Sequence, residues 1–236
     1  MPWDVWLIFF VLGVVVPWRG RVRLRELLKK PHVGTKERLS LYASTIAFQW
    51  LAVAVAGWRA WAHEYTAAQL GLIVHDWTKV MLVSVLGAMT LATLQWLNLR
   101  RVGRLPVHSR GPLQALAERI LPQSTLELFP FLGLAVTASV CEEFLYRGFA
   151  VAAFTRAGLP VWGVVLVSAI LFGLAHLYQG RGGFVSTLLL GVLFGMARIA
   201  YDGLVPVIAW HFAVDAVAGV AGPRFLTQNG ATGVEL

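Results

Sequence analysis

The segment from residue 125 to 149, TLELFPFLGLAVTASVCEEFLYRGF, is apolar over most of its length. A helix needs about 20 mostly apolar residues to cross the hydrocarbon core of a bilayer, and this run is long enough. Its second half contains the adjacent carboxylates Glu142 and Glu143, followed by Arg147. A charge at the bilayer centre costs about 2.5 to 3.5 kcal/mol even on lenient insertion scales. The segment therefore predicts a membrane-spanning helix whose ionisable residues face protein or a water-filled cavity.

The rest of the chain has the same apolar character. Its 236 residues are 58% hydrophobic and 14% charged, which is roughly half the charged fraction of an average soluble domain. We expect an all-α polytopic transmembrane helix bundle of about seven spans, with a turn at Gly180 to Gly183 and a short interfacial helix at 113–121. The other six spans are expected at residues 3–18, 39–61, 80–99, 161–178, 184–201 and 204–221.

No repeat or linker divides the chain, so we expect one membrane domain over residues 1–236. Within it, 1–124 holds the amino-terminal spans and the basic loops, and 125–221 holds the helices with ionisable residues.

The net charge of +8 comes largely from two basic segments, 19–38 and 100–123, which lie between apolar runs. Such segments stay on the cytoplasmic side, so the amino terminus is predicted outside and the carboxy terminus inside. This topological explanation, with no stacking aromatics interleaved in the first segment, argues against nucleic acid as a partner. Asp4 precedes the first run and arginines follow it, the reverse of a signal peptide, so an uncleaved first span is expected.

Ionisable residues also occur in two other apolar runs. His176 lies at the end of the fifth run, and His211 and Asp215 lie four residues apart in the seventh. A carboxylate that takes a proton from water, with histidines that hold charge on a carbonyl oxygen, is what amide hydrolysis needs. Each group also has a structural interpretation: Glu143 with Arg147 as an ion pair, His176 as a helix cap, and His211 with Asp215 as a hydrogen-bonded pair. Their occurrence on three separate runs favours a shared site.

The remaining histidines and the single cysteine are interpreted as non-catalytic. Four histidines lie in polar segments and are expected to be solvated: His32, His63, His75 and His108. Cys141 excludes an intrachain disulfide, and we interpret it as a small buried residue rather than a thiol nucleophile.

At these residues the sequence resembles the CPBP family of intramembrane proteases, which includes the CAAX prenyl endopeptidases and many bacterial relatives. The three family motifs occur in order: E-E-x-x-x-R at 142–147, F-x-x-x-H at 172–176, and H-x-x-x-D at 211–215. The matching region is about a third of the chain, and residues 1–124 carry none of it. The resemblance implies a peptidase, with a membrane protein or peptide as substrate and the bacterial inner membrane as location.

The resemblance also implies roles for the motif residues. Glu142 looks like the base that activates the attacking water, and His176 like a second residue that holds this water. Glu143 and Arg147 look like supporting residues, with Glu143 sharing the catalytic work as an alternative. His211 with Asp215 would stabilise the oxyanion.

Two features of the resemblance leave alternatives open. The family usually has asparagine where this chain has Asp215, and an ionised carboxylate donates no hydrogen bond; Asp215 is therefore either protonated or orients His211. Family members have been described both as metalloproteases and as metal-independent glutamate proteases. A zinc ion, if bound, would take Glu142, His176 and His211 as ligands, but H-E-x-x-H is absent, so we expect no obligate cofactor.

Two other functional classes compete with the peptidase. Some relatives act by interaction, so a non-enzymatic membrane scaffold or immunity factor of the same fold is one alternative. A proton-coupled transporter is the other, because buried Glu, His and Arg also build proton relays. The absence of an inverted repeat in the sequence disfavours the transporter.

Overall fold

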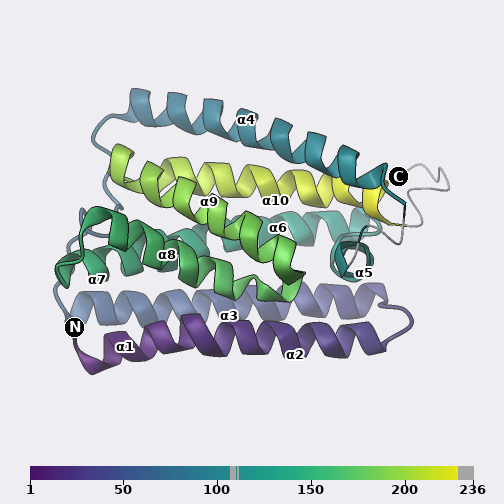
Figure 1. Ribbon diagram of the computed structural model, residues 1–236, viewed down its shortest axis with the longest axis horizontal. Coiled ribbons are helices and arrows are strands. Elements are labelled where there is room, and N and C mark those ends of the chain that lie inside the picture. Colours follow the sequence, from purple (N-terminus) through teal and green to yellow (C-terminus); the bar gives the residue numbers. More distant parts are fainter. Residues whose placement is uncertain (107–109, 111, 228–236) are drawn as a thin grey trace.

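The computed structural model describes residues 1–106, 110 and 112–227, and this part of the chain consists of helices and short connections without strands (Figure 1). The elements follow in chain order: α1 (Trp3–Phe10), the π-helix η1 (Val11–Val15), α2 (Val16–Lys29), α3 (Thr35–Ala62), α4 (Trp77–Gly103), α5 (Pro112–Ile120), α6 (Thr125–Glu143), the π-helix η3 (Phe144–Ala150), α7 (Val151–Arg156), α8 (Val161–Ala175), the 3-10 helix η4 (Leu177–Gln179), α9 (Gly180–Tyr201) and α10 (Val205–Leu226). The all-α fold class is confirmed.

Six continuous helical segments in the described residues are long and apolar enough to cross a membrane: Trp3–Lys29, Thr35–Ala62, Trp77–Gly103, Thr125–Arg156, Leu177–Tyr201 and Val205–Leu226. The fifth expected span, 161–178, corresponds to the shorter apolar helix α8, which ends at Ala175. The predicted interfacial helix at 113–121 corresponds to α5, which lies across one end of the bundle (Figure 1).

The first basic segment was predicted as a loop from residue 19, and this prediction is wrong for its first part. The helix that begins at Trp3 continues to Lys29. Arginine, lysine, leucine and glutamate are good helix formers, and long basic side chains reach the interface from a helix as well as from a loop. Only residues 30–34 connect this helix to α3.

The turn predicted at Gly180 to Gly183 is also misplaced. Gly180 begins α9, and the turn consists of His176 and η4. His176 follows the last residue of α8, and its Nδ1 lies 2.8 Å from the carbonyl oxygen of Phe172 in the last turn of that helix.

The outer faces of the long helices carry large apolar side chains, as expected for surfaces against lipid. Examples exposed by more than 60% are Leu51, Met89, Leu126, Phe129, Trp162 and Leu189. The core lies between the helices, where Val5, Phe149, Val164 and Val207 are fully buried.

A buried ion pair fixes α3 against α6 near the basic end of the bundle. Arg38 Nε donates to Glu127 Oε2 at 2.8 Å, and both side chains are almost completely buried. The same guanidinium donates to the carbonyl oxygens of Val33, Glu118 and Arg119. These bonds join α3, α5 and α6, and they hold α3 beside the helix that carries Glu142 and Glu143.

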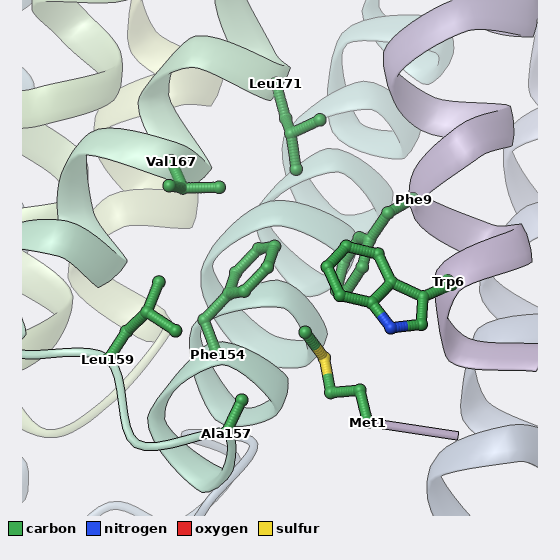
Figure 2. Close-up of a pocket in the computed structure, with 8 residues that line it drawn as sticks. All are labelled: Met1, Trp6, Phe9, Phe154, Ala157, Leu159, Val167 and Leu171. Carbon is green, nitrogen blue, oxygen red and sulfur yellow. The ribbon is translucent and has the colours of Figure 1, made fainter. Parts of the chain in front are cut away.

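A cavity of about 560 Å³ opens between α1, α7 and α8 (Figure 2). Its lining is apolar and includes Trp6, Phe9, Phe154 and Leu171. None of the ionisable residues singled out in the sequence lines it, so the candidate chemistry lies elsewhere.

Candidate active site

The two adjacent glutamates end α6 and face different partners. The side chains of Glu143 and Arg147 are fully buried, and Arg147 Nη1 donates to Glu143 Oε1 at 2.9 Å. This is the pair that the four-residue spacing predicts. Glu142 instead meets Gln49 of α3, whose Nε2 donates to Glu142 Oε1 at 2.7 Å. One carboxylate is thus neutralised by a cation while its neighbour is not.

The glutamates are followed at once by the π-helix η3. A π-helical turn of this kind is rare, and it is often found at functional sites because the extra residue re-aims side chains. Here it lies between Glu143 and the rest of the fourth span, and every residue from Leu145 to Ala150 is buried.

Aromatic rings supply most of the surroundings of the buried guanidinium. Arg147 Nε and Nη2 have no hydrogen-bond partner in the described part of the chain. The guanidinium carbon instead lies 4.2 Å from the ring centroid of Phe172 and 5.4 Å from that of Phe194. Cation–π attraction of this kind contributes about 2 kcal/mol or more when desolvated, and it compensates in part for the missing hydrogen bonds.

His211 of α10 joins the same carboxylate. Its Nδ1 lies 2.8 Å from Glu143 Oε1, the oxygen that Arg147 also contacts. An ionised carboxylate only accepts hydrogen bonds, so Nδ1 carries the proton. The other ring nitrogen, Nε2, lies 3.6 Å from Asp215 Oδ2, which is beyond hydrogen-bond distance.

His176 faces Glu142 across a gap. Its Nε2 lies 3.8 Å from Glu142 Oε2, an oxygen that is buried and has no hydrogen-bond partner in the described residues. The Nδ1 of His176 donates to the Phe172 carbonyl oxygen, since a carbonyl only accepts. In the neutral ring Nε2 is therefore an acceptor. One water lying beside this gap could donate one hydrogen to each of the two acceptors.

The structure brings all six predicted site residues together from α6, η3, α8 and α10. Exposure rises across the group: Glu143 and Arg147 are fully buried, Glu142 and His176 are 18% and 13% exposed, and Asp215 is 34% exposed. The site is therefore accessible from the side of Asp215 and Glu142.

The short length of α8 places His176 inside the bundle. Fifteen residues give a helix of about 22 Å, less than the roughly 30 Å hydrocarbon core. Irregular backbone at membrane depth is tolerated where protein or a polar cavity covers it. The turn from His176 to Gln179 is partly buried and packs against α2 and α5.

Two residues near the site were missed by the sequence analysis. Gln49 is a carboxamide in the second apolar run, and a polar residue in such a run is the signal that could have identified it. Phe194 of α9 contacts Arg147 and lies 6.0 Å from His211, centroid to centroid. An aromatic residue in an apolar run carries no signal that separates it from ordinary core.

The side chains do not fit a zinc site with the three ligands that the sequence suggested. His211 Nδ1 is occupied by Glu143 Oε1, which leaves only Nε2 of this ring, and that nitrogen lies 3.6 Å from Asp215 Oδ2. Among the described residues, no three His, Cys, Asp or Glu side chains are grouped closely enough to hold a metal ion.

The other singled-out residues lie away from this cluster or outside the description. Cys141 is fully buried. His32 and His75 are exposed, as predicted, and His108 lies outside the described residues. The prediction of a solvated His63 is wrong, because its Nε2 lies 2.9 Å from Asp4 Oδ2 and the ring joins α3 to α1.

Comparison with known proteins finds a family model that is similar to part of the chain. Residues 124–217 match the family model described as type II CAAX prenyl endopeptidase Rce1-like. No curated protein and no solved structure matches the chain. The matched range covers α6 to the middle of α10 and contains all six predicted site residues, so the resemblance seen in the three motifs is confirmed. The helices that carry the motifs are therefore similar to the Rce1-like type II CAAX prenyl endopeptidases.

Proposed function

We propose that this protein is an intramembrane endopeptidase that hydrolyses a peptide bond of a membrane protein or peptide with a water activated by Glu142. The observation that carries the proposal is the pair of acceptors, Glu142 Oε2 and His176 Nε2, which face each other 3.8 Å apart on side chains that are 18% and 13% exposed. The match to a protease family model supports it. The bacterial inner membrane is the proposed location.

The first chemical step is attack of water on the scissile carbonyl. A water between the two acceptors donates one hydrogen to Glu142 and the other to His176, which leaves an oxygen lone pair free to attack. Glu142 takes the proton as the new C–O bond forms. Collapse of the tetrahedral intermediate breaks the C–N bond, and the proton on Glu142 is transferred to the leaving amine.

The developing oxyanion needs donors at the same site. His211 can supply one from Nε2 when the ring carries a proton on both nitrogens, and the carboxylates of Glu143 and Asp215 on either side compensate that positive charge. We propose that Asp215 orients the His211 ring and stabilises its protonated form, because the Asp215 carboxylate faces Nε2 of that ring.

Substitution of Glu142 by glutamine tests this function. The variant keeps the size of the side chain and removes the base, so we expect cleavage to fall by about 10² to 10⁴-fold. The measurement is quantitative proteomics of membrane fractions from cells with wild-type or E142Q protein. We expect peptide termini that are present with the wild-type protein and missing with E142Q. Unchanged thermal unfolding of the detergent-solubilised variant is the control for folding.

The same variant distinguishes the competing class. A scaffold or immunity factor acts by binding, so E142Q and E142A would restore the phenotype of a deletion strain as well as the wild type does. Full restoration together with an identical set of peptide termini would overturn the peptidase function.

A further inference from the structure

We propose that Gln49, in the part of the chain that the family model does not match, is a positioning residue that sets the orientation of the Glu142 carboxylate. This inference rests on the proposed function, because it assigns Glu142 Oε2 to the attacking water. It gives α3 a direct part in the reaction, although the three motifs lie on other helices.

The contact is short and well shielded. Gln49 is 9% exposed, and its Nε2 donates to Glu142 Oε1 at 2.7 Å. A hydrogen bond to an ionised carboxylate is roughly twice as strong as one between neutral groups. The Arg38–Glu127 pair holds α3 against α6 further along the same two helices, so the approach of Gln49 to Glu142 is fixed by the fold.

The orientation of the carboxamide follows from the chemistry of its partner. Glutamine has one donor end and one acceptor end, which coordinates alone do not distinguish well. Glu142 must be ionised to act as a base, and an ionised carboxylate only accepts. The end that faces Glu142 is therefore the NH₂ group.

A carboxylate needs such a donor to hold one orientation. The last torsion of glutamate is broad, so a carboxylate without a fixed partner samples many rotations. With Oε1 held by Gln49, Oε2 is the oxygen that remains 3.8 Å from His176 Nε2. Loss of the donor would leave the water without a fixed acceptor on the side of Glu142.

The surroundings of Gln49 argue against a purely structural role. Its other polar atom, Oε1, is buried and has no hydrogen-bond partner in the described residues. The bond to Glu142 is the one side-chain hydrogen bond that Gln49 makes within the described part of the chain. Leucine would fill the same space at lower desolvation cost, so stability alone does not account for a carboxamide here.

The test compares Q49L with T45V. Thr45 lies one turn before Gln49 on the same face of α3, and its hydroxyl donates to the Leu41 carbonyl rather than to the site. The full chain is reconstituted with a membrane protein whose cleavage depends on Glu142. We expect Q49L to lower kcat by about 10- to 100-fold, the loss of one charge-assisted hydrogen bond, with KM nearly unchanged and the protein still folded. T45V should retain the wild-type kcat.

A spectroscopic measurement separates this inference from the proposed function. The infrared difference between a protein and the same protein with E142Q isolates the carboxylate bands of Glu142. Measured in this way, the bands should shift in Q49L and stay in place in T45V, whether or not a substrate is known. Bands that do not move in Q49L, or a wild-type kcat for Q49L, would overturn the role of Gln49. Shifted bands in a protein without any cleavage would overturn the peptidase function alone.

Discussion

At the scale of single residues, the buried guanidinium of Arg147 holds the candidate active site together. Arg147 is fully buried, makes one hydrogen bond to a side chain, and lies against two aromatic rings. Glu143 Oε1 accepts hydrogen bonds from both Arg147 and His211, so one oxygen connects η3 to α10. The buried carboxylate of Glu143 thus accepts hydrogen bonds from a cation and from a histidine ring, whereas Glu142 keeps an oxygen free.

Removal of the guanidinium should therefore unfold the site. In R147M the Glu143 carboxylate remains buried without its cation, and breaking a buried pair costs about 3 to 5 kcal/mol. We expect a large drop in the unfolding temperature of the detergent-solubilised protein, measured by tryptophan fluorescence. The double variant E143Q/R147M leaves no uncompensated charge and should recover much of the loss. A single variant as stable as the wild type would contradict this explanation.

The site residues that the sequence predicts are of two kinds: those whose partner lies on the same helix, and those whose charge is unfavourable in an apolar run. The spacing of Glu143 and Arg147 predicts their contact because both lie on one helical segment, and a carboxylate in an apolar run is conspicuous. Gln49 and Glu142 are separated by 93 residues, and their contact depends on how α3 packs against α6. Neither helix alone contains that information.

At the scale of elements, the placement of His176 depends on how closely α8 and α9 pack. A Cβ at Gly191 of α9 would lie 2.9 Å from the Ala169 Cα of α8. Backbone cannot move aside as a flexible side chain can, so glycine is required for this approach. Sequence periodicity predicted both helices but not their turn, since the four residues from His176 to Gln179 that form it carry no Gly or Pro signal.

Alanine at Gly191 should separate the two helices and displace His176 from Glu142. We expect G191A to destabilise the protein by about 1 to 3 kcal/mol, as other overpacked sites do, and to lower the cleavage rate. G133A is the matched control, since a Cβ at Gly133 in α6 would meet no atom within 4 Å. Alanine there should be neutral or stabilising by up to about 1 kcal/mol. Equal unfolding temperatures and rates for the two variants would rule out tight α8–α9 packing as the constraint.

At the scale of the whole molecule, charge is segregated along the bundle. The basic ends of α2 and α4 lie together with α5 at one end, and the α3–α4 connection and α7 lie at the other (Figure 1). From the distribution of lysine and arginine, the basic end is expected in the cytoplasm. Composition predicted this arrangement without the fold, because orientation depends on where charges lie along the chain rather than on packing.

Accessibility of single cysteines tests this orientation. Cys141 is the only cysteine, so C141A provides a background without thiols. His32 in the α2–α3 connection and Ala67 in the α3–α4 connection are both exposed, and their replacement by cysteine leaves the basic residues in place. In sealed spheroplasts, a membrane-impermeant maleimide should label A67C at once and H32C only after the membrane is disrupted. The reverse order of labelling would place the basic end outside and show that local charge does not decide the topology of this chain.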